Sequence, residues 1–429
     1  MPEHRLLFIT AKNYKNLEFR QPVDLNNLNI LIGANNFGKS NLISCLSFLK
    51  NSLINRPDES RGIGSLEDAA AKIGGGRILD FHVESPALVN LAYCFDISGD
   101  SRGAILDFDL YADRQRNRVN VAEEYLYSGE VLQQYRDKPP FYYYQFHDRE
   151  TGTGAVSVYN EGDSGQTHFE PLDNIPTNSL GLASIPSLLE TSKYAPENTP
   201  IYKIRREILE SVSTWQFYNA NHMDLNAIRE ATPKIGGSDI YLSASGDNLA
   251  LVLDNLSQQD IDFEDSINEA MKLIIPKTRR LRPIRSGVMS LTVEWYIEGL
   301  KEPFYLPEMS DGTVRMLCWA TILRSPRLPA LLVIDEPEMG LHVAWMPILA
   351  EWIKQAARKT QVIITTHSPD LLDHFTDCLE NVLCFVSEKQ NYFSIKRLSP
   401  EMLEPKLNEG WELGDLYRVG DPSIGGWPW

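Results

Sequence analysis

Long apolar runs are missing from this sequence of 429 residues. No stretch reaches the ~18 apolar residues that a membrane-spanning helix needs, and residues 1–16 lack the apolar run of a secretory signal peptide. Cysteine is also scarce. The chain has five cysteines, without paired metal-ligand spacing, so we expect buried free thiols. These absences predict a cytoplasmic protein with no membrane contact and no disulfide framework.

Positive charge is the other shortage. The chain has 41 lysine and arginine residues against 58 aspartate and glutamate residues, and its formal net charge is −17. Binding of nucleic acid over a broad surface is therefore excluded, because such binding depends on cations that neutralise phosphates. A local cluster remains at residues 277–285, KTRRLRPIR, which could either contact DNA or pair with the protein's own acids.

The hydrophobic periodicity predicts an α/β fold with two separated α/β segments. Short alternating runs between them, starting with an expected strand at Ile78–Val83, indicate a β-rich lobe, and an expected helix at Tyr202–Tyr218 indicates a mainly helical insertion. The predicted organisation is residues 1–50 as the N-terminal part of the core, 51–170 as the β-rich lobe, 171–300 as the helical insertion, 301–400 as the C-terminal part of the core and 401–429 as a tail.

Residues 33–40, GANNFGKS, match the phosphate-binding pattern G-x-x-x-x-G-K-[ST]. An apolar strand at 28–32 precedes the loop and a helix from Lys39 to Leu49 follows it, as this motif requires. The loop N–H groups and the helix N-terminus favour a phosphate, the Lys39 ammonium reaches the β- and γ-phosphates, and the Ser40 hydroxyl binds Mg²⁺. The sequence thus predicts ATP and Mg²⁺ as cofactors, with nucleotide binding by Gly33, Asn35, Asn36, Gly38, Lys39, Ser40 and Asn41.

A second motif, LLVIDEP at residues 331–337, is an apolar strand that ends in two acids. Asp335 is placed to hold the Mg²⁺ shell through water, and Glu336 to orient and polarise the attacking water. Most of the chain separates Lys39 from Asp335. The nucleotide core is therefore interrupted by a long insertion, as in ABC, RecF and SMC-type ATPases and unlike RecA-like or small GTPase-like cores.

Two further segments occur at the positions along the chain that are typical of an ABC-type ATPase site. The segment Ser310–Thr313 precedes an apolar helix, where a serine commonly caps the helix, and the same group could also close over a γ-phosphate held by another subunit. The strand VIITT ends at His367, whose imidazole could hydrogen-bond the γ-phosphate and distinguish ATP from ADP. The predicted catalytic residues are therefore Lys39, Glu336 and His367.

Together these motifs resemble the ABC/RecF/SMC-like ATPases grouped with the overcoming-lysogenization-defect (OLD) family, of the AAA-21 type. The resemblance is carried by LPEMSDGTVRMLCWATILRSPRLPALLVIDEPEMGLH and QVIITTHSPDLLDHF in the C-terminal half, and by WQFYNANHMDLNAIRE and LSASGDNLALVLDNL in the middle. It implies an ABC-type ATPase head that works as a homodimer or larger homo-oligomer, with Ser310 and Gly312 acting in trans. The Mg²⁺-contacting glutamine of ABC ATPases has no evident counterpart, and we expect the adenine contact within Asn13–Asn16.

The resemblance also bears on function. Stand-alone proteins of this kind resemble bacterial anti-phage defence ATPases of the PARIS, Septu and retron-associated types, in which an ATPase scaffold controls a separately encoded effector, often a nuclease. Only residues 368–429 follow His367, too few for the TOPRIM nuclease domain of OLD proteins, so we expect the effector to be a separate protein. The alternatives are a RecF-like or SMC-like DNA-binding ATPase in DNA repair or organisation, and a nucleotide-locked scaffold with little turnover.

Overall fold

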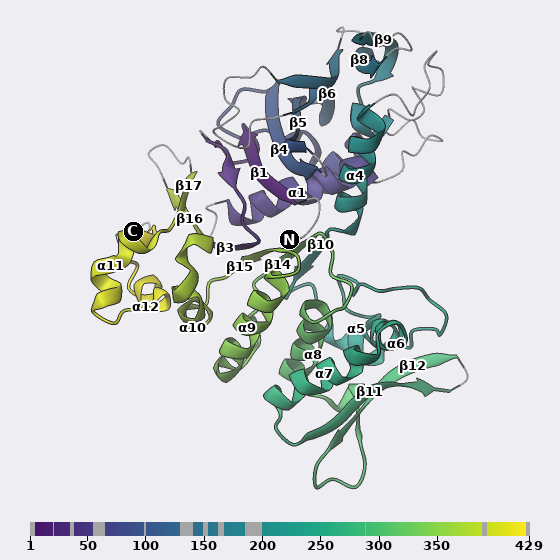
Figure 1. The fold of residues 1–429 in the computed structure, drawn as a ribbon, viewed down its shortest axis with the longest axis vertical. Coiled ribbons are helices and arrows are strands. Elements are labelled where there is room, and N and C mark those ends of the chain that lie inside the picture. The colour runs from purple at the N-terminus through teal and green to yellow at the C-terminus, as the bar shows by residue number, and fades with distance from the viewer. Residues whose placement is uncertain are drawn as a thin grey trace.

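The computed structural model describes residues 5–19, 21–34, 38–54, 65–97, 100–128, 140–148, 153–161, 167–184, 200–287, 289–387 and 393–425. A mostly parallel sheet crosses the middle of the molecule, a larger antiparallel sheet lies at one end, and helices with a small antiparallel sheet lie at the other (Figure 1). Within the described ranges, no helix has the length and apolarity needed to cross a bilayer.

The central sheet has six strands in the order β10-β14-β15-β3-β16-β17. These are β3 (Leu28–Ile32), β10 (Gln216–Asn219), β14 (Leu331–Asp335), β15 (Gln361–Thr365), β16 (Val382–Ser387) and β17 (Phe393–Arg397). Neighbours pair in parallel except β16 and β17. β3 comes from the N-terminal part of the chain and lies between two strands from the C-terminal part. The predicted split α/β core is therefore confirmed.

The antiparallel sheet of eight strands forms the β-rich lobe, but it begins earlier in the chain than predicted. Its strands are β1 (Leu6–Lys12), β2 (Val23–Asp24), β4 (Ala87–Ile97), β5 (Asp100–Asp113), β6 (Arg118–Ser128), β7 (Phe141–Asp148), β8 (Thr153–Glu161) and β9 (Thr167–Pro176). β1 pairs with β4 rather than with the central sheet, so the boundary placed at residue 50 needs correction. Over the fully described range 65–97, the strand expected at Ile78–Val83 is replaced by a 3₁₀ turn, η1 (Gly75–Ile78), and further turns. Gly74 and Gly75 favour these turns because both adopt positive φ angles.

The described part of segment 171–300 contains strands as well as helices. Its helices are α4 (Pro200–Thr214), α5 (Leu225–Glu230), α6 (Leu249–Gln259) and α7 (Ile261–Ile274). The helix expected at Tyr202–Tyr218 ends at Thr214, because the next residues pair with β14 as the edge strand β10. The segment also supplies β11 (Thr278–Ser286) and β12 (Ser290–Ile297), which form a small sheet with β13 (Phe304–Tyr305).

Two hydrophobic cores lie on opposite faces of the central sheet. Leu31 of β3 and Ile363 of β15 belong to the core shared with the β-rich lobe, whereas Ile30 and Ile364 belong to the other core. This division follows from the strand geometry, because successive side chains point to opposite faces. α1 (Lys39–Ile54) and α2 (Ser65–Lys72) contribute to the first core, and α8 (Asp311–Leu323), α9 (Met346–Ala357), α10 (Pro369–Leu372), α11 (Pro400–Asn408) and α12 (Leu413–Arg418) contribute to the second.

Candidate functional site

The phosphate-binding loop connects the end of β3 to the start of α1. Gly33 and Gly38 have positive φ angles of 140° and 102°. A Cβ on Gly33 would lie 2.7 Å from a carbonyl oxygen of β16, and one on Gly38 would lie 2.8 Å from Leu17 Cδ2, so a side chain fits at neither position. The predicted nucleotide contacts Asn35 and Asn36 lie outside the described residues.

The Lys39 side chain is buried beneath this loop. Its Nζ donates hydrogen bonds to the carbonyl oxygens of Gly33 at 2.7 Å and Ala34 at 3.0 Å. Burial lowers the pKa of Lys39 to about 8, although the carboxylates of Asp335 and Glu336 act in the opposite direction. A phosphate beside this ammonium would supply a strong charge-assisted hydrogen-bond acceptor.

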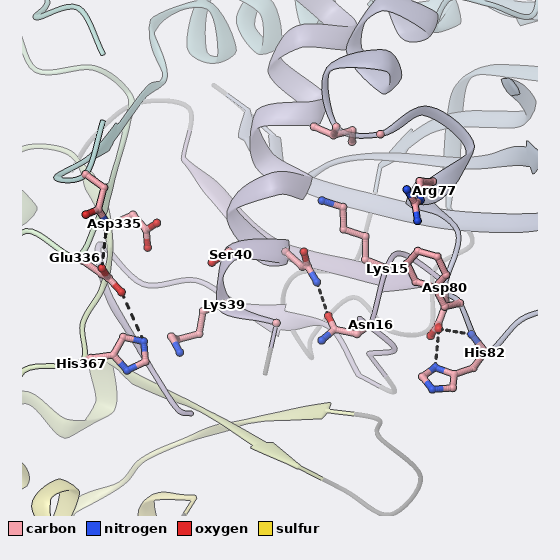
Figure 2. A pocket seen from close by; sticks show the side chains of 16 residues that line it. Lys15, Asn16, Lys39, Ser40, Arg77, Asp80, His82, Asp335, Glu336 and His367 are labelled. Carbon is pink, nitrogen blue, oxygen red and sulfur yellow. Dashed lines mark hydrogen bonds and ion pairs between the residues drawn. The ribbon is translucent and has the colours of Figure 1, made fainter. Parts of the chain in front are cut away.

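One cavity of about 1020 Å³ brings together predicted site residues from both ends of the chain (Figure 2). Lys39 and Ser40 come from the start of α1, Asp335 and Glu336 from the end of β14, and His367 from the segment after β15. They meet because the carboxyl ends of parallel strands lie at one edge of a sheet. The cavity is lined by Lys15, Asn16, Gly38, Lys39, Ser40, Asn41, Ile73, Gly74, Arg77, Asp80, Phe81, His82, Asn221, Asp335, Glu336 and His367.

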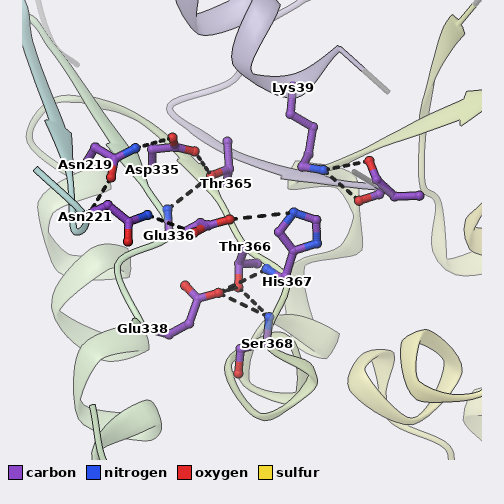
Figure 3. A network of polar contacts seen from close by, with 12 residues as sticks. Lys39, Asn219, Asn221, Asp335, Glu336, Glu338, Thr365, Thr366, His367 and Ser368 are labelled. Carbon is purple, nitrogen blue, oxygen red and sulfur yellow. Dashed lines mark hydrogen bonds and ion pairs between the residues drawn. The ribbon is translucent and has the colours of Figure 1, made fainter. Parts of the chain in front are cut away.

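Two side chains from neighbouring strands orient the Asp335 carboxylate (Figure 3). The Asn219 amide donates to Oδ2 at 2.6 Å, and the Thr365 hydroxyl donates to Oδ1. Asn219 ends β10 and Thr365 ends β15, on either side of β14. The sequence reasoning did not single out Asn219, although this residue lies in the family-like segment WQFYNANH.

The oxygen groups at this edge of the sheet fit Mg²⁺. This ion usually binds proteins through one or two carboxylates together with substrate phosphates and water. The Asp335 carboxylate and the exposed Ser40 hydroxyl line the same cavity and are oxygen ligands of this kind. Among the described residues, no group of three or more His, Cys, Asp and Glu side chains could hold a metal ion. Nucleotide phosphates would therefore have to complete the ligand set.

Glu336 has an unusual backbone. Its φ angle is 52°, a left-handed conformation that is rare for residues other than glycine. The Glu336 N–H is held by the Thr365 carbonyl oxygen at 3.2 Å and hydroxyl at 3.1 Å. The carboxylate accepts a hydrogen bond of 3.4 Å from the Asn221 amide and lies 3.8 Å from His367 Nε2. Strained backbone of this kind concentrates at functional sites, where it aims a side chain.

Glu338 holds the segment that carries His367 (Figure 3). Its Oε1 accepts hydrogen bonds from the Thr366 hydroxyl at 2.6 Å and from the backbone N–H groups of His367 at 3.0 Å and Ser368 at 3.2 Å. Burial raises the pKa of Glu338. Burial and the Lys39 charge lower the pKa of His367 to about 4, so its imidazole is neutral near pH 7. Thr366 and Glu338 were not predicted as site residues.

The predicted in-trans residues lie outside this cavity. Ser310 is exposed and caps α8, since its hydroxyl accepts from the Thr313 N–H at 3.4 Å. Gly312 lies against the Trp345 ring, and a Cβ there would lie 2.8 Å from Cζ3. The capping role is thus formed within the chain, while the role in trans remains a prediction.

The cavity lining includes an exposed aromatic ring that the sequence did not reveal. Lys15 and Asn16, from the region expected to contact adenine, also line the cavity and lie between Ser40 and Asp80 in the view of Figure 2. The Phe81 side chain is 63% exposed, and the guanidinium carbons of Arg77 and Arg114 lie 5.6 and 5.5 Å from its ring centroid. In the sequence, the glycine-rich run at 74–76 was the feature that indicated a loop close to Phe81.

Comparisons with known proteins bear on the family and the fold of this chain. The family model described as "AAA domain, putative AbiEii toxin, Type IV TA system" matches residues 28–373. The solved Smc head bound to the C-winged helix domain of ScpA is 13% identical with a TM-score of 0.51, over 92% of this chain and 99% of that chain. The Smc head with an extended coiled coil from Pyrococcus furiosus is 13% identical with a TM-score of 0.46, over 95% and 99% of the two chains. The SMC head domain from Thermotoga maritima is 11% identical with a TM-score of 0.43, over 92% and 99%.

No curated protein sequence matches this chain. The family match nevertheless spans both halves of the split core, from β3 to the helix that follows His367. The fold that the chain shares with the first of these Smc heads is the predicted ABC-type α/β head. The chain therefore belongs to this AAA-domain family of P-loop ATPases and has the fold of an SMC head.

Proposed function

We propose that this ATPase binds ATP with Mg²⁺ and hydrolyses it, with Lys39, Glu336 and His367 as its catalytic residues. The cavity in which these side chains meet Asp335 and Ser40 is the observation that carries the proposal. Lys39 neutralises charge on the β- and γ-phosphates, Glu336 orients the attacking water, and His367 contacts the γ-phosphate. Positioning and charge stabilisation of this kind supply most of the catalysis in phosphoryl transfer.

The same proposal names the residues that bind the metal ion and the adenine base of ATP. Ser40 and Asp335 would hold Mg²⁺, and the ion would stabilise negative charge on the phosphates. Asn221 takes the place of the missing glutamine, since its exposed amide lies beside Glu336 at the end of β10. The base stacks on Phe81, whose exposed ring lines the same cavity.

We further propose that the active form is a homodimer or larger assembly in which Ser310 and Gly312 of one subunit close over the γ-phosphate held by another. Two features near Ser310 and Gly312 support a subunit interface. Ser310 is exposed at the N-terminus of α8, where the helix dipole favours an anion. Met339 and Val343, on the connection near Gly312, are apolar and 38% and 54% exposed.

The assembly is proposed to act in the bacterial cytoplasm as a nucleotide-dependent scaffold that controls a separate effector, a nuclease, in anti-phage defence. The support is the resemblance carried by the motifs, together with a solved Smc head that carries a bound ScpA domain. ATP would move such a switch only through its different affinity for the open and closed forms. Co-expression with the product of a neighbouring gene tests this part. Co-purification that requires ATP supports the proposal, and its absence with every neighbouring product contradicts it.

The alternative, a DNA-binding ATPase, is less well supported by the basic cluster at 277–285. Arg280 pairs with Glu264 at 2.7 Å, and Arg282 pairs with Glu294 at 2.6 Å. These cations therefore already have acidic partners in the protein, and a DNA phosphate would have to displace them. DNA affinity that falls steeply with rising salt would favour this alternative.

The mass of the purified protein in solution with ATP and Mg²⁺ tests the central proposal. Glu336→Gln retains the nucleotide contacts and removes the carboxylate that orients water, so we expect a stable ATP-dependent dimer or larger species without turnover. Lys39→Ala removes the phosphate-binding ammonium, so we expect a monomer at every ATP concentration. If wild type and both variants stay monomeric, the assignment of Ser310 and Gly312 in trans is wrong.

A further inference from the structure

The imidazole of His367 is held from behind by a residue of the C-terminal segment. His367 Nδ1 lies 3.0 Å from the hydroxyl oxygen of Tyr417, a residue of α12. The other ring nitrogen, Nε2, is turned toward the catalytic cavity and lies 3.8 Å from Glu336 Oε1. One side of the ring therefore contacts the last α-helix of the described residues, and the other side faces the catalytic carboxylate.

α12 is fixed firmly to the segment that carries His367. A Cβ on Gly414 would lie 2.1 Å from the Pro369 carbonyl oxygen and 2.2 Å from Asp373 Oδ1, so only glycine allows this approach. Arg418 forms ion pairs with Asp370 at 2.6 Å and Asp373 at 3.2 Å. These contacts lie within a few residues of His367 in α10 and the turn after it. They hold the Tyr417 hydroxyl at a defined place beside the ring.

The Tyr417 hydroxyl and His367 Nδ1 can share their hydrogen bond in two ways, according to the tautomer of the imidazole, and only one of them suits a phosphate beside Nε2. The Tyr417 side chain is buried, and burial raises its pKa to about 12, so the phenol keeps its proton near pH 7. A neutral imidazole carries one N–H and one bare nitrogen. If the phenol donates to Nδ1, the N–H must be on Nε2. In the opposite tautomer, Nε2 would present a lone pair to the phosphate oxygens and repel them.

We propose that Tyr417 is a positioning residue that holds His367 in the tautomer with its proton on Nε2, so that an N–H faces the γ-phosphate. This inference rests on the proposed ATP hydrolysis and adds a residue from the tail to that site. The rate of ATP hydrolysis therefore depends on the position of the C-terminal tail. Displacement of α12 frees the imidazole to rotate or to change tautomer, and hydrolysis slows while nucleotide remains bound.

Steady-state kinetics of the full chain with Tyr417→Phe tests the role. Phenylalanine keeps the packing of the ring and removes one hydrogen bond, so we expect kcat to fall about 10-fold with KM for ATP unchanged. In a His367→Ala background the same change should have no further effect, because the group that Tyr417 orients is gone. Tyr93→Phe is the matched control. It removes a buried hydroxyl on β4 that donates to the Cys45 carbonyl oxygen of α1 at 2.8 Å, and it should leave kcat unchanged because neither residue lines the cavity.

Nitrogen NMR of histidine-labelled protein gives a readout that does not depend on turnover. The chain has eight histidines, and the His367→Ala spectrum assigns the signal. We expect a single Nε2–H tautomer in wild type and a mixture in Tyr417→Phe. A wild-type ring protonated on Nδ1, or wild-type kcat in Tyr417→Phe, would overturn the inference. If wild type does not hydrolyse ATP at all, the proposed function fails, and the tautomer measurement still decides the role of Tyr417.

Discussion

Asn219 donates a hydrogen bond of 2.6 Å from its side-chain amide to Oδ2 of Asp335, and the two residues are direct register partners on the parallel strands β10 and β14. β10 lies within the segment 171–300, which was predicted as the insertion, and β14 belongs to the C-terminal part of the core. The insertion therefore contributes to the metal side of the site. Partners that orient a metal-binding group affect metal affinity nearly as strongly as the ligand itself.

Asn219→Ala should raise the Mg²⁺ concentration for half-maximal ATPase activity by ~10-fold or more, because Asp335 loses one of the groups that aim it. Mg²⁺ titrations at saturating ATP measure this effect. Asn90→Ala is a suitable control, since the Asn90 amide donates to Asp107 at 2.8 Å and Asp109 at 3.0 Å in the β-rich lobe, away from the cavity. An unchanged Mg²⁺ requirement in Asn219→Ala would mean that Asn219 does not support the metal.

Glu338→Gln should change how stability depends on pH. Burial raises the pKa of Glu338 in the folded chain, so the folded protein keeps a proton that the unfolded chain loses near pH 4.3. This stabilising contribution is complete below the unfolded pKa and is lost as pH rises through the folded pKa. Glutamine still offers Oε1 to the same donors and has no proton to lose.

Urea unfolding between pH 4 and 8 checks this prediction. The unfolding free energy of Glu338→Gln, relative to wild type, should rise with pH until the folded pKa is passed and then stay level. Two parallel stability curves would show that Glu338 titrates normally in the fold. Glu338→Ala should lower kcat, because the N–H groups of His367 and Ser368 lose their acceptor.

Phe81→Ala should raise KM for ATP about 10-fold and leave kcat almost unchanged, since stacking on a base contributes equally to the ground and transition states. Initial rates over a range of ATP concentrations separate the two constants. Leu88→Ala provides the comparison, because Leu88 is an exposed apolar residue, 46% exposed, that does not line the cavity. A lower kcat with an unchanged KM would remove Phe81 from the base site.

Mixtures of two inactive variants test whether the site is shared between subunits. The Lys39→Ala variant has an intact Ser310, and the Ser310→Arg variant has an intact Lys39. If Ser310 acts in trans, mixing should restore ATPase activity that neither variant has alone, because a mixed dimer carries one intact site, formed by Lys39 of one subunit and Ser310 of the other. Ser310 is exposed, so the arginine variant should fold normally. Inactive mixtures would place Ser310 in the same subunit's site or outside any site.

Gly414→Ala should displace α12 and lower kcat by a similar factor to Tyr417→Phe. The added Cβ meets backbone and carboxylate oxygens that cannot withdraw without moving the helix. Gly410→Ala is the control, because a Cβ there enters open space and its cost is limited to backbone strain at a φ angle of 87°. Wild-type kcat in Gly414→Ala, with the same melting temperature as Gly410→Ala, would show that close docking of α12 does not matter.

The sequence alone was sufficient to predict the site residues that belong to short motifs, because in these motifs the same few residues set both the backbone conformation and the chemistry. The loop at 33–40 requires glycines where the backbone has positive φ angles, and its lysine and serine suit a phosphate and Mg²⁺. Asp335 and His367 follow apolar strands, and acids or histidines at the carboxyl ends of parallel strands meet at one edge. Each of these patterns spans only a few consecutive residues, so each can be predicted without knowledge of the fold.

Only the tertiary structure decided which distant residues support that site. Asn219, Phe81 and Tyr417 come from an edge strand, a turn of the β-rich lobe and the last described α-helix, and none of them belongs to the motifs from which the site residues were predicted. For the same reason the sequence could not show which sheet β1 joins. Its short apolar sequence suits either sheet, and its pairing with β4 depends on the packing of the whole lobe. Side-chain contacts between segments far apart in sequence depend on how those segments pack, and periodicity within one segment carries no information about its partner.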